Sequence, residues 1–463
     1  MAGKRQINGS IVALYAIFLI ALGFRLAWIA QTDTQLLPLS DPQYYHATAQ
    51  NLAEGRGYQV TLDSSLVGRG FIAGDDSEGT AFWAPGYPFA LAPLYAISDS
   101  DERAAKLFNA VVGALTVLPV FYLGRKLAGS YLAPSNADSN AVPMYQRPAT
   151  VGLAAAAVFA LAPTLAYWTP SLFSEPLFTF GIAMTLATAA WAGDRRTLVA
   201  FFLTGIVLTA TAFVRSQGML MIVPVAMLIL RSYDGRALVR TFAPVAAAIA
   251  LLVFPWALRN EAVMGRPYLI NDNLGYNLRL AHAPYSEGTS VPPQDLWDEQ
   301  PGITFKEREI LFDDLGRERA LEYMREHPGR EVELAVKRVS YLVRSDAEAS
   351  IHWSESLGLS TLATGPRDLW ITLGDLYWYL LLVATIASPF LLPKTRMAWA
   401  MWSALIVWLL LHTVFAGEPR YHVPLMPVMA VVSGAALVRS WQMLVAPAPS
   451  AKPAAGATTQ PER

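Results

Sequence analysis

The feature that most constrains this chain is a series of apolar stretches, each close to the length of a membrane-spanning helix. A helix needs about 20 predominantly apolar residues to cross roughly 30 Å of hydrocarbon. Apolar windows closed at charges, Gly or Pro predict about ten such helices. They cover residues 11–30, 103–124, 149–168, 176–192, 197–213, 218–230, 241–258, 369–392, 397–415 and 423–438. Because 54% of the 463 residues are hydrophobic and only 15% are charged, we expect an integral membrane protein.

The basic residues between these spans predict the orientation. Loops rich in Lys and Arg stay on the cytoplasmic side of a membrane. If the amino terminus, with Lys4 and Arg5, is cytoplasmic, the same side receives Arg125, Lys126, Arg147, Arg195, Arg196, Arg231, Arg236, Arg240, Lys394, Arg396 and Arg439. The first span holds Arg25 and lacks a small-residue cleavage site, which favours a retained signal anchor. We therefore expect a multi-pass membrane protein whose long connections face away from the cytoplasm.

Two long segments fall on the outer side and define the domains. We expect a transmembrane module at 1–258 with a first periplasmic loop at 31–102, and a periplasmic soluble domain at 259–367. Residues 368–440 are predicted to form the C-terminal transmembrane helices, and 441–463 a disordered cytoplasmic tail. The stretch WAPGYPFALAPLYAI in the first loop is short for a span and is expected to form a helix at the interface. The predicted fold class is an all-α polytopic membrane protein with a smaller mixed periplasmic domain.

Composition excludes several kinds of chemistry. The chain has no Cys, so it has no disulfide framework, no thiolate zinc site and no cysteine nucleophile. Its six His residues are scattered and show no paired ligand spacing. No cofactor is indicated with certainty, and a requirement for a divalent metal is left open.

An acidic residue followed by proline recurs on the predicted outer face. Asp41 stands in SDPQYY, Glu175 in SEPL and Glu418 in GEPRYH. Each pair could serve only as a helix start, because the carboxylate accepts from free amides and proline tolerates the first helical position. Arg215, in FVRSQG, and Arg420 lie at the same predicted depth, where ionisable groups are costly and usually functional. Such a concentration of charge exceeds what capping requires.

These groups have complementary chemistry. A carboxylate at an apolar–polar boundary is partly desolvated, which suits it to take a proton from an attacking hydroxyl. Asp41 is the candidate base. Arginine neutralises a phosphate through paired, charge-assisted hydrogen bonds, and Arg420 is the candidate phosphate ligand. The alternative for Arg420 is an interfacial side chain that extends toward lipid headgroups.

Five segments in order resemble landmarks of the GT-C glycosyltransferases, in the bacterial branch similar to protein O-mannosyltransferases and lipid A aminoarabinose transferases. They are DPQYYHATAQNLAEGRGY, APGYPFALAPLY, LFSEPLF, GYNLRL and GEPRYHVPLMPVM, within residues 11 to about 440. The resemblance implies inverting transfer from a polyprenyl-phosphate sugar, with Asp41 as general base. It also implies that Glu175 lies near the acceptor or an optional metal. Arg420 and Tyr421 would lie at the donor phosphate. Together with the predicted topology, the resemblance implies a bacterial cytoplasmic (inner) membrane protein with its active site facing the periplasm or exterior.

Two departures from the family pattern bear on the acceptor and on the residue that binds the donor phosphate. Protein mannosyltransferases pair the first-loop Asp with an adjacent Glu, whereas Asp41 is followed by Pro42, so a cell-envelope glycan or glycolipid acceptor is favoured over protein. Aminoarabinose transferases usually show Lys-Pro-Pro where this chain reads FWAPGYP. The missing lysine would be replaced by Arg215, Arg420 or Lys337, or the donor would be held differently.

Further residues are candidates for the substrate cavity, and one alternative function stays open. The cavity candidates are Tyr44, Tyr45, Tyr87, Asn277, Lys337 and Glu418. The alternative is a transporter or flippase for a polyprenyl-linked envelope precursor. Such transporters usually show inverted repeats and broken helices near the bilayer midplane, and neither is evident in the sequence. We therefore expect a glycosyltransferase with a lipid-linked sugar, a membrane lipid and an envelope acceptor as partners, and no nucleic acid.

Overall fold

A computed structural model describes residues 9–34, 41–60, 79–132, 143–230, 234–297, 304–356, 360–362 and 364–445. Helices dominate these residues. The helices of the bundle are α1 (Gly9–Gln31), α4 (Glu102–Leu115), α5 (Val117–Gly129), α6 (Pro148–Ala160), α7 (Pro163–Tyr167), α8 (Glu175–Arg195), α9 (Leu198–Val214), α10 (Ile222–Ile229), α11 (Gly235–Met264), α17 (Thr364–Leu391), α18 (Arg396–Val414) and α19 (Met426–Val445).

The remaining elements are short or lie in the long connections. They are β1 (Thr32–Thr34), α2 (Asp41–Ala53), α3 (Gly86–Ser98), α12 (Leu274–Ala281), α13 (Gln294–Trp297), α14 (Phe305–Glu326), α15 (Pro328–Arg344), α16 (Ala347–Ser356) and β2 (Ser360–Leu362). Four 3₁₀ turns complete the described chain: η2 (Met144–Gln146), η3 (Ser216–Met221), η4 (Pro419–Tyr421) and η5 (Val423–Leu425).

The predicted membrane spans are present. Among the described residues, seven helical segments are long and apolar enough to cross a membrane: Gly9–Gln31, Glu102–Gly129, Glu175–Arg195, Gly235–Met264, Arg367–Leu391, Arg396–Val414 and Pro419–Val445. The shorter apolar helices are Pro148–Ala160, Leu198–Val214 and Ser216–Ile229. Each predicted span coincides with one of these segments, which confirms the all-α polytopic fold class.

The ends of some spans differ from prediction for local reasons. The span expected at 149–168 divides, because α6 ends at Ala160 and Pro163 begins the short α7. At the carboxyl end, α19 continues to Val445, beyond the expected end of the last span at 438. Residues 441–445 of the expected tail are therefore helical, and the rest of that tail lies outside the described residues.

Small residues bring the central helices close together. A Cβ added at Gly124 of α5 would stand 3.0 Å from the Cα of Gly152 in α6, and one at Gly434 of α19 would stand 2.6 Å from the backbone nitrogen of Ala155. Small side chains at helix crossings allow the backbones to pack directly, which drives association of helices in lipid. As a result α19 is largely buried in the middle of the bundle.

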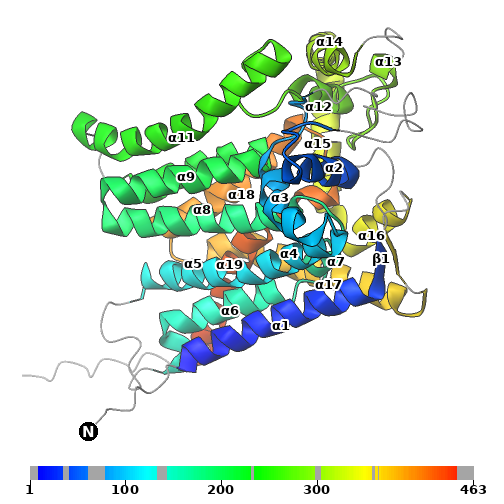
Figure 1. Cartoon of the computed structure of the whole chain (residues 1–463). Coiled ribbons are helices and arrows are strands. Elements are labelled where there is room, and N and C mark those ends of the chain that lie inside the picture. The colour runs from blue at the N-terminus through cyan, green and yellow to red at the C-terminus, as the bar shows by residue number, and fades with distance from the viewer. Residues whose placement is uncertain are drawn as a thin grey trace, which may run out of the picture.

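The long connections gather at one end of the bundle, as Figure 1 shows. Helices α2, α3, α12, α14, α15 and α16 lie at that end, whereas the first turns of α1 lie at the opposite end. The described residues of 259–367 form helices and one short strand, β2, which pairs antiparallel with β1 from the end of α1. The mixed character expected for this segment is therefore not confirmed, and its independence as a domain stays a prediction.

Buried polar contacts attach the segment after α11 to the first loop. Glu309 of α14 accepts hydrogen bonds from the Thr80 hydroxyl and, at 3.3 Å, from the backbone N–H of Ala81. The N–H of Asp272 donates to the carbonyl oxygen of Ala81 at 3.1 Å. These contacts fix the stretch just before Phe82 and Trp83, which line the candidate site.

Candidate active site

Two adjoining cavities open where the connections meet. The first, the polar cavity, has a volume of about 270 Å³ and is bounded by α2, the junction of α9 with η3, α12 and η4. Its walls carry Asp41, Tyr45, Trp83, Arg215, Arg420 and Tyr421 together with the amides of Gln217, Asn271, Asn273 and Asn277. The cavity therefore combines a carboxylate, two guanidinium groups and neutral amides.

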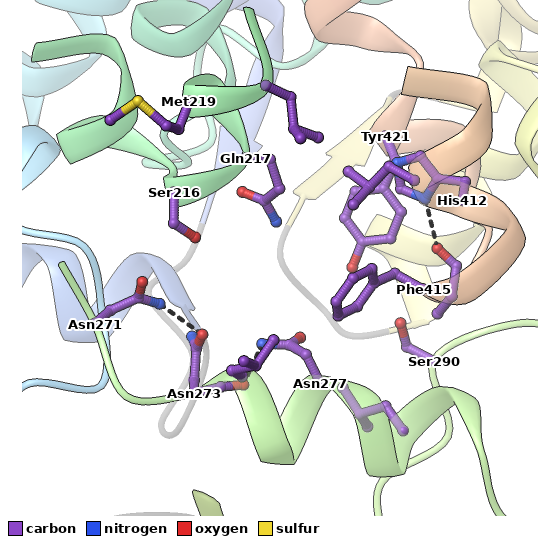
Figure 2. A pocket seen from close by; sticks show the side chains of 15 residues that line it. Ser216, Gln217, Met219, Asn271, Asn273, Asn277, Ser290, His412, Phe415 and Tyr421 are labelled. Carbon is purple, nitrogen blue, oxygen red and sulfur yellow. Dashed lines mark hydrogen bonds between the residues drawn. The ribbon is translucent and has the colours of Figure 1, made fainter. Parts of the chain in front are cut away.

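The second, the apolar cavity, has a volume of about 260 Å³ and shares a wall with the first. Its apolar lining consists of Met219, Leu220, Leu274, Leu280, Leu411, Phe415 and Ala416. Figure 2 shows Gln217 of η3 and Asn277 of α12 on opposite sides of this space, with Tyr421 and Phe415 beside them. A ligand with a polar head and an apolar tail could occupy both cavities at once.

Asp41 begins α2, as its Asp-Pro sequence predicts, and its carboxylate lies in the polar cavity. One oxygen accepts a hydrogen bond from the indole N–H of Trp83 at 3.4 Å. The other lies 3.6 Å from Nη1 of Arg420. The side chain keeps 35% of its surface exposed, so it is accessible to a ligand. Both contacts are long, which leaves the carboxylate loosely held.

Arg420 is positioned from several sides. Its Nε lies 3.2 Å from Oε2 of Glu418, and its Nη2 donates to the Tyr421 hydroxyl at 3.0 Å. The guanidinium also lies over the rings of Tyr421 and Phe173, 4.9 and 5.7 Å from their centroids. Contact with aromatic faces supports a cation and restricts its plane. Glu418 is fixed in turn by the backbone N–H of Ser290, which donates to it at 3.2 Å.

Arg215 enters the polar cavity from the end of α9 and is supported by a buried acid. Its Nη2 lies 2.9 Å from Oε1 of Glu175, and its Nε donates to the Ser174 hydroxyl at 3.0 Å. Glu175 begins α8 and has no exposed surface, whereas 13% of the Arg215 side chain is exposed. The guanidinium thus contacts the cavity while the carboxylate stays behind it.

Tyr45 lies beside these charges with its ring buried. Burial raises the pKa of its hydroxyl to about 12, and the nearby Asp41 carboxylate contributes in the same direction. The phenol therefore stays protonated at neutral pH and can donate a hydrogen bond.

The other residues predicted for the cavity occupy different places. Tyr44 is 2% exposed and stacks on Trp83 with ring centroids 4.0 Å apart. Tyr87 is fully buried and donates to Asn109 at 3.2 Å. Lys337 forms ion pairs with Glu287 and Glu333. Neither Tyr44, Tyr87 nor Lys337 lines the polar or the apolar cavity. Glu418 lies behind Arg420, in the wall of a neighbouring cavity that Arg420 shares.

Several lining residues carried no clear sequence signal. Trp83 donates a hydrogen bond to Asp41, yet nothing in the stretch FWAPGYP pointed to a contact with that acid. Gln217 and Asn273 lie in ordinary turn-like stretches, since Asn and Gly are common in turns. Within the described residues, no group of three or more His, Asp or Glu side chains is placed to hold a metal ion.

Comparison with solved structures identifies the fold. The oligosaccharyltransferase of Archaeoglobus fulgidus, tethered to an acceptor peptide containing the NVT sequon, superposes with a TM-score of 0.52 and 14% sequence identity. The match covers 95% of this chain and 50% of that one, so this chain spans about half the length of the archaeal protein. The match with ArnT from Cupriavidus metallidurans bound to undecaprenyl phosphate covers 94% of this chain and 79% of that one, at 12% identity and a TM-score of 0.39.

No protein-family model and no curated protein matches the chain. The fold is of the GT-C type, as the resemblance of the sequence landmarks led us to expect. At this level of identity the likeness establishes the architecture alone.

Proposed function

We propose that this protein is an inverting glycosyltransferase that moves a sugar from a polyprenyl-phosphate donor to a hydroxyl of a cell-envelope glycan or glycolipid. The observation that carries the proposal is the placement of Asp41, Arg215 and Arg420 around one polar cavity that continues into an apolar one. The GT-C fold supports it, because a solved structure that shares this fold is that of an oligosaccharyltransferase. The long connections that form the site would face the periplasm or exterior.

In this mechanism Asp41 is the general base. It accepts the proton of the acceptor hydroxyl while the oxygen attacks the anomeric carbon of the donor sugar. The bond between that carbon and the phosphate oxygen breaks on the opposite face, and its electron pair leaves with the polyprenyl phosphate. Attack from the opposite face inverts the anomeric configuration.

Arg420 and Arg215 bind the departing phosphate. In the free protein these arginines lie among three carboxylates, Asp41, Glu175 and Glu418. Of the arginine–carboxylate contacts, the 3.6 Å contact of Arg420 with Asp41 is the longest and the easiest for a phosphate to replace. Asp41 is then released as a base and loses its own charge when it takes the proton. Charge in the cavity therefore stays balanced through the transfer.

The polar and the apolar cavity bind different parts of the donor. The sugar lies in the polar cavity, where amides of Gln217, Asn271 and Asn277 provide donors and acceptors for hydroxyl groups. The first isoprene units lie along the apolar cavity, against Leu411 and Phe415. Glu175 acts through Arg215 rather than by touching the substrate, because it is fully buried behind that arginine.

Mass spectrometry of envelope glycolipids and glycans tests this function. Asp41→Asn keeps the size of the side chain and removes the base, so we expect at least a 100-fold loss of one glycosyl product and accumulation of its lipid-linked donor. The matched control is Asp101→Asn, which alters an exposed cap of α4 that asparagine also serves well. Both variants are compared at equal abundance in the membrane.

The same experiment separates the alternatives. Normal product from the Asp41→Asn protein would exclude the assigned base. If deletion of the whole gene leaves the donor pool and all glycosyl products unchanged, the transferase is rejected. A lipid-linked precursor retained on the cytoplasmic face after deletion would instead favour the transporter or flippase.

A further inference from the structure

Another cavity lies at the opposite end of the bundle from Asp41. It has a volume of about 440 Å³ and is open to the surface where α8 turns into α9 and where α10 precedes α11, so that its three arginines are exposed. Its walls are formed by Arg196, Phe201, Ile229, Arg236, Ala237, Arg240 and Thr241. In Figure 1 this region is the left-hand end of α8, α9 and α11, away from α2 and α12. The cavity therefore belongs to neither part of the candidate active site.

Local geometry brings the three arginines to this cavity. Arg196 is the residue that ends α8, and its backbone is in the left-handed region with φ of 54°. Arg236 and Arg240 are four residues apart on the first turns of α11, so they share one face of the helix. Phe201 and Ile229 close the inner wall and are almost fully buried.

Three arginine side chains give the cavity a positive charge. Within the described residues none of Arg196, Arg236 and Arg240 forms a side-chain hydrogen bond or an ion pair. Of the nearest acids in the sequence, Asp194 pairs with Lys126, and Asp234, the N-cap of α11, accepts from the N–H of Ala237 at the edge of the cavity. Like charges that line one cavity repel, and an anion between them would relieve that cost.

The surroundings of the cavity are apolar and exposed. Leu198 and Val199 on the first turn of α9 are 53% and 66% exposed, and Val239 of α11 is 67% exposed. Apolar side chains at the surface of membrane helices contact acyl chains. An anion that also carries acyl chains would therefore satisfy both the arginines and the neighbouring apolar side chains.

We infer that this cavity binds the phosphate headgroup of an anionic phospholipid. Guanidinium groups bind phosphate oxygens through paired hydrogen bonds, and basic pockets between membrane helices are known to bind such headgroups. Phosphate is the shared chemistry of a lipid and a free ion, and the exposed apolar side chains favour the lipid. The inference does not depend on the proposed glycosyltransferase activity.

Lipid binding to the purified full-length protein in phosphatidylcholine nanodiscs tests this site. The probe is phosphatidylglycerol, measured by native mass spectrometry and by the thermal unfolding midpoint. We expect the wild-type protein to prefer phosphatidylglycerol to phosphatidylcholine by at least tenfold, and Arg236→Gln/Arg240→Gln to lose that preference. Arg195→Gln is the matched control, because Arg195 is exposed in the same turn but does not line the cavity.

Two outcomes would overturn the inference. One is equal binding of both lipids by the wild-type protein or an equal loss in the Arg195→Gln control. The other is stabilisation by millimolar inorganic phosphate that matches phosphatidylglycerol, which would assign the cavity to a free anion. Should the double variant fail to fold, Arg240→Gln alone is measured, and an unchanged lipid preference in it likewise contradicts the site.

Discussion

The buried ion pair of Glu175 and Arg215 is expected to contribute to the stability of the fold. Glu175 is fully buried and Arg215 nearly so, and they contact each other at 2.9 Å. We predict that Arg215→Gln lowers the free energy of unfolding by about 3–5 kcal/mol, because it leaves an uncompensated carboxylate in the interior. The double variant Glu175→Gln/Arg215→Gln should recover most of that loss. Thermal unfolding in detergent measures both.

A pair of charges at the surface provides the control for these Glu175 and Arg215 variants. Asp194 and Lys126 form an ion pair with half-exposed side chains, so Asp194→Asn should cost no more than about 1 kcal/mol. An equal loss from Asp194→Asn and Arg215→Gln would show that burial of the Glu175 pair has no special energetic role. A double variant as unstable as Arg215→Gln alone would show that Glu175 is not its partner.

The buried carboxyl group of Asp272 should make the stability of the protein depend on pH. Asp272 is 1% exposed, and neither carboxylate oxygen has a hydrogen-bond partner among the described residues. Burial, and then the charge of Asp313, raises the pKa of Asp272 to about 7. The folded state thus holds the proton more tightly than the unfolded chain. Stabilisation from this group is complete below about pH 4 and is lost as the pH rises through about 7.

The measurement is the thermal midpoint at pH 5.5 and at pH 8. Asp272→Asn should reduce the difference between the two midpoints. Asp314 is the control, because hydrogen bonding to Arg266 lowers its pKa and its titration lies below this window. If Asp272→Asn and the wild-type protein lose the same stability between the two pH values, another group is responsible.

Among the elements, the crossing of α12 over α14 sets the position of one wall of the polar cavity. A Cβ added at Gly275 would overlap the carbonyl oxygen of Asp313. We predict that Gly275→Ala forces α12 away from α14, costs about 1–3 kcal/mol by overpacking, and lowers activity because Asn277 moves with α12. Thermal unfolding and product formation are both measured.

A second glycine serves as the control for this crossing. Gly329 in α15 has open space at its Cβ position, so Gly329→Ala should stabilise the helix by roughly 0.5–1 kcal/mol and leave activity intact. Equal behaviour of the two alanine variants would mean that the contact of α12 with α14 does not position the cavity.

For the whole molecule, apolar stretches predicted the places of the apolar helical segments found among the described residues, because lipid permits few alternatives to a helix. The acid-Pro sites marked helix starts correctly at Asp41 and Glu175. The partners were harder to predict. Nothing in the sequence shows that Trp83 bonds to Asp41 or that Glu175 lies behind Arg215, because these contacts depend on how distant segments pack. Lys337 illustrates the same limit, since surface acids engage it away from the polar cavity.

Orientation in the membrane follows from the positions of the basic loops and stays a prediction that can be tested directly. The chain has no cysteine, so a single introduced thiol reports its own location without any prior change to the protein. Glu326, at the end of α14, and Arg195, at the end of α8, are both exposed and lie at opposite ends of the bundle.

Because basic loops remain cytoplasmic, a membrane-impermeant maleimide should label Glu326→Cys in cells whose inner membrane is intact. Arg195→Cys should react only after that membrane is opened. The reverse pattern would place Asp41 on the cytoplasmic side and would contradict the predicted orientation.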